Sequence, residues 1–166
     1  MAEVKLARVD FRLIHGQIVV EWCKAFEVDK IVVIDNVVAG DEFMLRIYAS
    51  AVPAGIAVKA YDEAKALRLW EKNRFGDGKK VLILFKDLET CHRMIQAGMD
   101  LKSVQLGGVP QMQDRKAVKR AIFLGPKEMR QLKELRDMGV DITAQLVPED
   151  SKYDYDGIVK AYGSDK

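Results

Sequence analysis

The sequence predicts an α/β fold, with a single domain, a mainly parallel central sheet of about seven strands and helices on both faces. Short apolar runs alternate with longer amphipathic stretches along the whole chain. Several runs, such as residues 31–34, are apolar at every position, which is typical of strands covered on both faces. No proline-rich or serine-rich linker and no internal repeat interrupts the alternation, so residues 1–166 are expected to form one domain.

The strands are predicted from these apolar runs. In chain order they cover residues 4–9, 30–34, 56–61, 81–85, 103–106, 121–124 and 141–147. Because the functional crevice of such a sheet lies beyond the carboxyl ends of its strands, the loops that begin at Asp10, Asp35, Lys86 and Gly107 are where a site is expected.

The helices are predicted from 3.6-residue periodicity and from their end signals. The first follows His15, where apolar residues at i, i+3, i+4 and i+7 form one stripe, namely Val19, Trp22, Cys23 and Phe26. The others cover residues 41–51, 62–70, 87–98 and 126–138. Asp62 and Asp87 are expected N-caps, Pro126 suits a first helical turn, and Gly139 follows the last apolar position as a helix-ending glycine does.

Composition and charge exclude several classes of protein. With 49% hydrophobic and 31% charged residues, the 166-residue chain is neither disordered nor of low complexity. A net charge of +2 is well short of the basic excess of a nucleic-acid binder, so no nucleic-acid partner is expected. The chain has no run of 18 apolar residues and no secretory signal pattern, and Cys23 and Cys91 suggest neither disulfides nor zinc. The expected location is the cytoplasm.

The loop around His15 carries the strongest chemical signal. Imidazole is a nucleophile near neutral pH, and Asp10 is placed to bind one ring nitrogen, which leaves the other to attack. Arg12 can present a fork of donors to phosphate oxygens, and Gly16 does not crowd a ligand near the helix N-terminus, where backbone N–H groups favour anions. These residues could accept a phosphoryl group, although a polar loop without chemistry has the same composition.

Other polar features have structural interpretations. His92 is expected within a helix, at the border of its apolar stripe, Cys23 is expected in the core, and residues 76–80 are expected in a turn. Gly107 and Gly108 are expected either to let a neighbouring loop approach closely or to form a simple turn. A solvated position is the simplest explanation for Lys86, and Asp35 is left open. The basic cluster Arg115, Lys116, Lys119 and Arg120 is expected to be a solvated face, with a docking patch for an acidic partner as the alternative.

The run from Arg8 to Gln17, RVDFRLIHGQ, resembles the N-terminal signature of the mannose/fructose/sorbose-type enzyme IIB of the bacterial phosphotransferase system. In that family an apolar stretch ending in tryptophan follows, here at Trp22. The resemblance continues through residues 30–36, 81–85 and 98–108 to Val147-Pro148, and so extends over essentially the whole chain. The first motif is specific, and the later ones support it.

The resemblance implies a phosphocarrier, a transferase component without metal or cofactor. His15 would accept a phosphoryl group at Nδ1 from a phosphohistidine of enzyme IIA, and the group would pass to a sugar entering through the membrane subunits IIC and IID. Arg12 matches the arginine that holds the phosphoryl group, and Asp10, Gly16 and Gln17 are expected to bind or orient it. The protein would then lie at the cytoplasmic side of the membrane, peripherally bound to the permease subunits.

One position departs from the family pattern. Phe11 stands where the family commonly has a second acidic residue, so Asp10 alone would orient the imidazole, and Phe11 is expected to face a docking surface. Two other functions stay open, a small hydrolase that uses Asp10 and His15 as an acid–base pair and a non-catalytic ligand-binding module. The sequence leaves the sugar and any homo-oligomer undetermined.

Overall fold

The computed structural model describes residues 2–163, apart from the side chains of residues 17 and 18. The strands are β1 (Glu3–Asp10), β2 (Lys30–Ile34), β3 (Ala57–Tyr61), β4 (Lys80–Phe85), β5 (Ser103–Gly108), β6 (Lys116–Lys119), β7 (Ile122–Leu124), β8 (Asp141–Ala144) and β9 (Tyr153–Asp154). The helices are α1 (Gly16–Ala25), α2 (Glu42–Ala51), α3 (Glu63–Asn73), α4 (Leu88–Gln96), α5 (Pro126–Asp137) and α6 (Tyr155–Gly163), with a 3₁₀ turn, η1, at Val38–Gly40.

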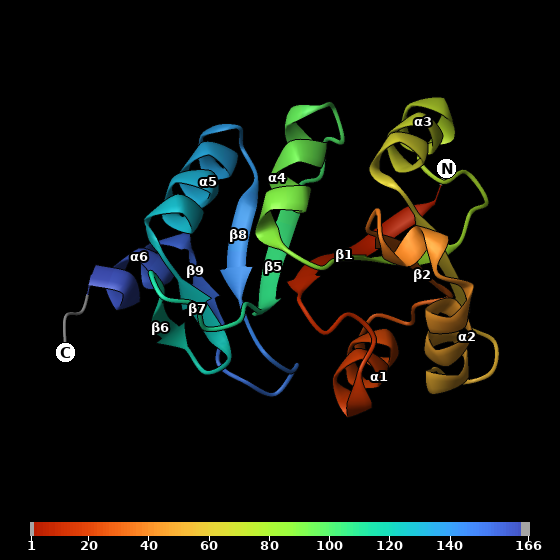
Figure 1. The fold of residues 1–166 in the computed structure, drawn as a ribbon, viewed down its shortest axis with the longest axis horizontal. Coiled ribbons are helices and arrows are strands. Elements are labelled where there is room, and N and C mark those ends of the chain that lie inside the picture. Colours follow the sequence, from red (N-terminus) through yellow and green to blue (C-terminus); the bar gives the residue numbers. More distant parts are fainter. Residues whose placement is uncertain (1, 164–166) are drawn as a thin grey trace.

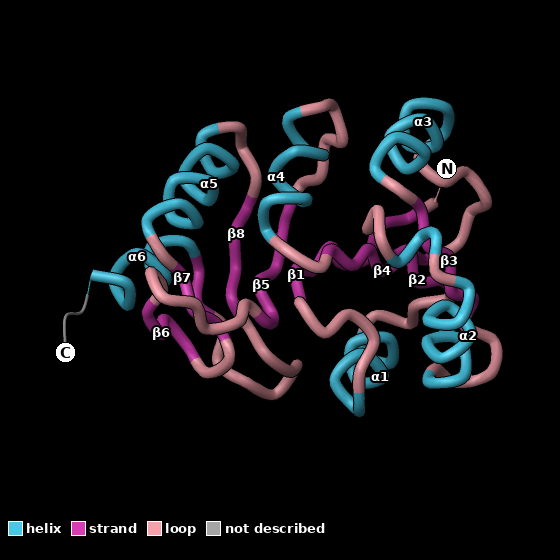
Figure 2. The backbone as a smooth tube through the Cα atoms, viewed as in Figure 1, coloured by secondary structure: helices cyan, strands magenta, loops and turns pink. Residues whose placement is uncertain are grey.

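A seven-stranded sheet in the order β3-β2-β4-β1-β5-β8-β9 forms the centre of the molecule. All its neighbouring strands are parallel except β9, which pairs antiparallel with β8. Helices α1 and α2 lie on one face, and α3, α4 and α5 lie on the other (Figures 1 and 2). The predicted α/β fold with a mainly parallel sheet is therefore confirmed.

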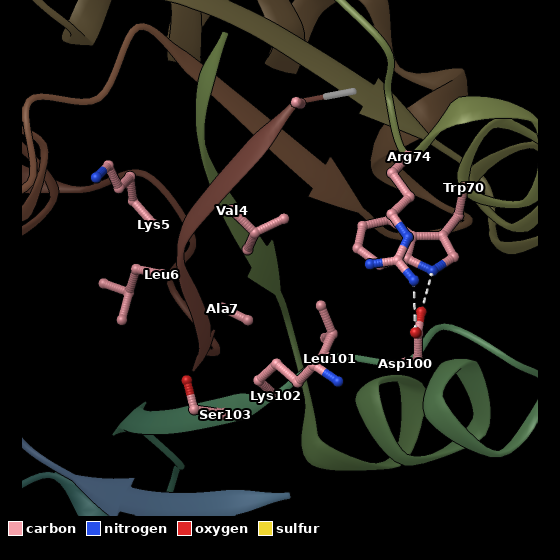
Figure 3. Close-up of a pocket in the computed structure, with 11 residues that line it drawn as sticks. Val4, Lys5, Leu6, Ala7, Trp70, Arg74, Asp100, Leu101, Lys102 and Ser103 are labelled. Carbon is pink, nitrogen blue, oxygen red and sulfur yellow. Dashed lines mark hydrogen bonds and ion pairs between the residues drawn. The ribbon is translucent and has the colours of Figure 1, made fainter. Parts of the chain in front are cut away.

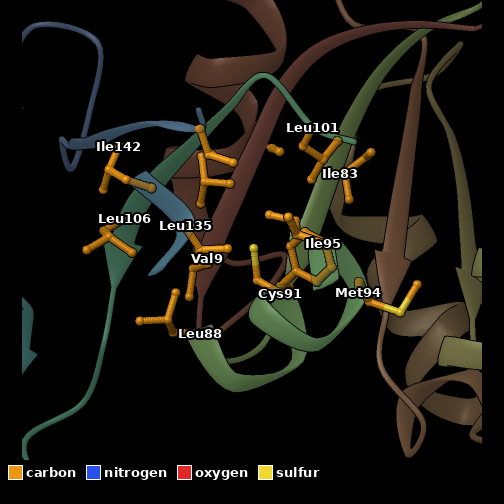
Figure 4. Packing of buried hydrophobic residues seen from close by; sticks show 14 of the residues in the cluster. Val9, Ile83, Leu88, Cys91, Met94, Ile95, Leu101, Leu106, Leu135 and Ile142 are labelled. Carbon is orange, nitrogen blue, oxygen red and sulfur yellow. The ribbon is translucent and has the colours of Figure 1, made fainter. Parts of the chain in front are cut away.

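The two faces of the sheet bury separate cores because successive strand residues point to opposite sides. In β1, Ala7 and Val9 belong to the core beneath α3, α4 and α5, where Cys91, Leu106 and Leu135 also pack (Figure 4). The core beneath α1 and α2 contains Val19 and Cys23 of α1 and Tyr48 of α2. Arg8 and Asp10 alternate with Ala7 and Val9, so the same alternation turns these two charged residues toward α1.

The predicted helix ends are confirmed where a side chain or a glycine sets them. The Asp62 carboxylate accepts a hydrogen bond from Lys65 N (2.7 Å), and Asp87 accepts one from Thr90 N (2.7 Å). Pro126 begins α5, and Gly139 follows that helix with a φ of +91°, which a side chain disfavours.

Three details of the prediction are wrong. The segment 121–124 does not join the main sheet, because β7 pairs with β6 in a separate antiparallel hairpin whose turn includes Ala121 at a φ of +65°. The strand predicted through residue 147 ends at Ala144, and the backbone beyond it turns toward Arg8. The sequence prediction also lacked β6, β9 and α6, which are short elements stabilised by contacts with one another and with β8.

None of the helices described here is long and apolar enough to cross a membrane.

Candidate functional site

The loop that joins β1 to α1 is held by its own backbone and by two buried side chains. Arg12 N donates to Asp10 Oδ1 (3.1 Å), and Leu13 N donates to Asp10 O (2.9 Å), which closes a tight turn. Leu13 and Ile14 are buried against α1. Leu13 has a φ of +56°, so this turn holds a branched residue in the left-handed region. The loop therefore presents His15 from an ordered backbone.

His15 is the N-cap residue of α1, and its ring bonds to Asp10 as the sequence predicted. The His15 Nε2 to Asp10 Oδ2 distance is 3.0 Å, and among the described residues Nδ1 has no hydrogen-bond partner. Burial raises the pKa of the Asp10 carboxyl, but the His15 hydrogen bond and the Arg8 charge outweigh burial and bring that pKa below its usual range. An ionised Asp10 only accepts hydrogen bonds, so in the neutral ring Nε2 is the nitrogen that carries the proton and Nδ1 is the one with the lone pair.

Arg8 is the second partner of Asp10, and the sequence analysis assigned it no role. Its side chain is 2% exposed, and Nη2 lies 3.3 Å from Asp10 Oδ2. The guanidinium also donates to Gln105 Oε1 and to the carbonyls of Gln145 (2.9 Å) and Leu146 (3.0 Å). Burial lowers the pKa of Arg8 and the Asp10 charge opposes that, yet an arginine keeps its proton in proteins. Arg8 thus holds a negative charge behind His15.

Trp22 of α1 packs against this network and bonds to one of its carbonyls. The Arg8 guanidinium carbon lies 5.4 Å from the centre of the Trp22 ring, within the range of a cation–π contact. The Trp22 indole N–H donates to Leu146 O (3.0 Å), the same carbonyl that accepts from Arg8. One segment of the β8–β9 loop therefore ties α1 and β1 together.

Gly107 and Gly108 explain how two charged side chains fit against β5. A Cβ at Gly107 would lie 2.0 Å from the Arg8 guanidinium carbon, and one at Gly108 would lie 2.7 Å from Asp10 Oδ1. Of the two expectations for this pair, the close approach of neighbouring groups is therefore the one the structure supports. The signal for Arg8 in the sequence was an arginine between two apolar residues of a strand, Ala7 and Val9.

The remaining predicted site residues have different positions. The Arg12 side chain is exposed at the loop, and within the described residues its guanidinium has no bonded partner. Gly16 has a φ of +48°, and a Cβ there would meet open space, so the backbone conformation is the reason for glycine. Gln17 begins the first turn of α1, but its side chain lies outside the described part.

The other candidates of the sequence analysis have structural roles. His92 is half-buried and lies 2.9 Å from Glu134, at the border between the buried and exposed faces of α4 as expected. The Asp35 carboxylate accepts from Val37 N and Val38 N, which makes it a turn residue. Burial raises the pKa of the Cys23 thiol to about 11, which is unsuited to a nucleophile at neutral pH.

The basic cluster is not one free patch. Lys119 Nζ lies 3.3 Å from Asp150, and Arg115 Nη2 lies 3.2 Å from Glu128. Lys116 rests over the ring of Tyr162, at 4.5 Å from its centre. Most of these basic side chains therefore already contact groups within the protein, which leaves less free charge for a docking patch.

A small cavity of about 140 Å³ lies at the opposite edge of the sheet, by the amino ends of β1 and β5 (Figure 3). Three of its polar groups bond to one another, because Asp100 accepts from Trp70 Nε1 (2.9 Å) and from Arg74 Nη2 (2.6 Å). Among the described residues, no histidine or cysteine lines this cavity, so the His15 loop is the stronger candidate site.

Comparison with known proteins points to one family. Residues 4–166 match the family described as the PTS system sorbose subfamily IIB component. The chain is 30% identical over 149 residues to the mannose-specific EIIAB component of Escherichia coli (strain K12), which spans 90% of this chain and 46% of that protein. It therefore spans about half the length of that relative. The fructose-specific EIIB component of Bacillus subtilis (strain 168) is 27% identical over 160 residues, 96% of this chain and 98% of that protein.

Solved structures agree. manxB from Thermoanaerobacter tengcongensis superposes with a TM-score of 0.91 at 35% identity and covers 98% of both chains. The IIBSor domain of the sorbose permease from Klebsiella pneumoniae superposes with a TM-score of 0.86 at 26% identity, over 95% of this chain and 97% of that one.

Proposed function

This chain belongs to the sorbose subfamily of PTS system IIB components, and we propose that it carries a phosphoryl group on His15. The observation that supports this most is the bond of His15 Nε2 to Asp10, which leaves Nδ1 free at the start of α1. A nucleophile needs a lone pair and a fixed direction, and this arrangement supplies both.

In the proposed first step, the Nδ1 lone pair attacks the phosphorus of a phosphohistidine on enzyme IIA. The phosphorus–nitrogen bond of the donor breaks, and its electron pair returns to the donor imidazole. The attacking ring is the neutral tautomer with its proton on Nε2, bonded to Asp10, so Nδ1 has no proton to lose. The His15 ring becomes more positive as the new bond forms, and the ionised Asp10 stabilises that charge.

The phosphoryl oxygens need neutralisation more than proton chemistry. The exposed Arg12 guanidinium and the backbone N–H groups at the N-terminus of α1 are the groups on this side of the loop that can bind them. Gly16 allows the backbone to adopt a φ of +48° at the start of this helix. Arg8 acts behind the ring by holding Asp10, so it is a positioning residue.

In the second step, a sugar hydroxyl gives up its proton to solvent and its oxygen attacks the phosphorus, while the bond to Nδ1 breaks and returns the lone pair to His15. We assign this step to a sugar held by the membrane subunits IIC and IID, with the chain bound at their cytoplasmic side. The related proteins include mannose-, fructose- and sorbose-specific components, so the sugar itself is not assigned.

A hydrolase is the main competitor, and Asp10 and His15 would be its acid–base pair. The structure gives Asp10 a lowered pKa and a buried cation beside it, which favour a permanent charge over proton exchange. The carrier is therefore the better-supported proposal.

The test uses phosphoenolpyruvate, the general phosphotransferase proteins and a matched IIA, with mass spectrometry and ³¹P NMR as readouts. The expected result is one acid-labile phosphoryl group on the chain, absent from His15→Ala. If IIA becomes phosphorylated and the chain gains no mass, the carrier proposal is wrong. Release of inorganic phosphate from a small ester without IIA would instead support the hydrolase.

A further inference from the structure

A second cavity lies at the same edge of the sheet as His15 but on the face of α4 and α5. It has a volume of about 390 Å³ and is formed by the loops after β1, β4 and β5 and by the first turns of α4 and α5. We call it the α4–α5 pocket, defined by Phe11, Lys86, Leu88, Met112, Arg115 and Gln131. Its volume is in the range of small-molecule sites.

The carboxylates in its wall are already bonded within the protein. Asp87 accepts from Thr90 N (2.7 Å), Glu89 accepts from Lys127 Nζ (3.2 Å), and Glu128 accepts from Arg115 Nη2 (3.2 Å). These groups therefore offer little to a ligand that donates hydrogen bonds.

The unbonded polar groups in the wall are mainly donors. Gln131 is only 8% exposed, and its amide has no hydrogen-bond partner among the described residues. Lys86 is exposed at the rim, and its ammonium pairs with no described carboxylate. Lys86 and the Gln131 amide can both donate to acceptor oxygens, so a ligand with such oxygens fits this wall.

The remainder of the wall is apolar. Leu88 and Val109 are buried at its base, while Phe11 and Met112 are exposed large hydrophobic residues that also line it. An inorganic ion would leave this surface uncovered, whereas the carbon skeleton of an organic ligand would cover it. The first turns of α4 and α5 both belong to the wall, and helix N-termini favour a negative group.

We propose that the α4–α5 pocket binds a small organic phosphate, of the class of monosaccharide phosphates. The phosphate would lie by Lys86 and the helix N-termini, the carbon skeleton would pack on Phe11 and Met112, and a hydroxyl would bond to Gln131. That the ester is a sugar phosphate rests on the proposed function, which produces such a compound. This site would hold the ligand, and it is separate from His15, where the phosphoryl group is transferred.

Phe11 links the pocket to the phosphorylation loop. It directly follows Asp10, and its backbone N–H donates to Gly108 O (3.0 Å). A ligand packed on the Phe11 ring would therefore contact the residue next to Asp10, at the edge of the phosphorylation loop.

The test measures binding directly, by calorimetry and by amide NMR shifts, with mannose 6-phosphate, mannose and inorganic phosphate as probes. We expect saturable binding of the ester, with shifts at Phe11 and Gln131. Gln131→Met and Lys86→Gln each remove a bond to the ligand and should raise the Kd about tenfold. The matched control Lys133→Gln changes an exposed lysine of α5 that pairs with Asp137 outside the pocket, and should keep the wild-type Kd.

Several results would overturn the proposal. Equal binding of mannose would exclude the anion site, equal binding of inorganic phosphate would exclude the apolar contacts, and an unchanged Kd in Lys86→Gln and Gln131→Met would exclude the pocket. Loss of binding in His15→Ala would place the ester at the phosphorylation loop instead. If the chain binds the ester but is not phosphorylated by IIA, the pocket proposal stands and the proposed function is refuted. Failure of the pocket proposal and failure of the proposed function can therefore be told apart.

Discussion

Replacement of Arg8 by methionine tests whether the buried ion pair organises the site. Methionine keeps much of the side-chain length but leaves the Asp10 carboxylate, which is 3% exposed, without a cation. It also leaves the carbonyls of Gln145 and Leu146 without their charged donor. Removal of one partner from a buried pair costs about 3–5 kcal/mol, so we expect Arg8→Met to lower the free energy of unfolding by about 4 kcal/mol at neutral pH.

The size of this effect should depend on pH in a defined direction. In the wild type the pKa of Asp10 is lowered, so its contribution to stability is present above the unfolded pKa of about 4 and is lost as the pH falls through the lower folded pKa. In Arg8→Met, burial no longer has the arginine charge opposing it, and the folded pKa of Asp10 should rise. The difference in the free energy of unfolding between wild type and Arg8→Met should therefore become smaller as the pH falls.

The assay is urea unfolding of wild type, Arg8→Met, Asp10→Asn and the double variant, at neutral pH and near pH 4. Because the double variant contains no unpaired carboxylate, it should be more stable than Arg8→Met alone at neutral pH, with a coupling of about 1–3 kcal/mol. A loss below about 1 kcal/mol in Arg8→Met, with no coupling and no pH dependence, would refute the assigned role of the ion pair.

Three further substitutions test the site. Asp10→Asn keeps a hydrogen-bond acceptor for His15 but removes the charge, so the rate of phosphorylation by IIA should fall about 10²-fold or more in a quenched-flow assay, and an unchanged rate would contradict the orienting role. Arg12→Ala should leave the urea midpoint nearly unchanged, because the side chain is exposed, yet slow phosphorylation about 10²–10³-fold, and equal rates would remove Arg12 from the site. Gly107→Ala places a methyl group 2.0 Å from the Arg8 guanidinium carbon and should cost about 1–3 kcal/mol in the same unfolding assay, whereas a neutral result would mean that Arg8 can move without loss.

The fold could be predicted from patterns that act over a few residues. The β-branched run of β2 and the aspartate caps of α3 and α4 gave elements that the structure confirms to within three residues at each end. The β6–β7 hairpin and α6 were not predicted, because short elements depend on the surfaces they meet. Here α6 packs on β6 and β8.

The candidate site likewise contains residues that could be predicted from the sequence and residues that could not. His15 and Asp10 are five residues apart on a strand and the loop that follows it, so their meeting could be predicted from sequence. Arg8 is only two residues from Asp10, but its role was missed because its other partners include Gln105, 97 residues away, and Gln145, 137 residues away.

Local signals thus specified the alternation of strands and helices, most helix ends and the histidine loop, since periodicity, caps and turns depend on neighbours along the chain. The burial of Arg8, the need for glycine at Gly107 and Gly108, and the α4–α5 pocket arise only after distant segments pack together. The physical reason is that a buried charge is stable only when all its partners are in place, and the sheet brings together partners that the sequence keeps far apart.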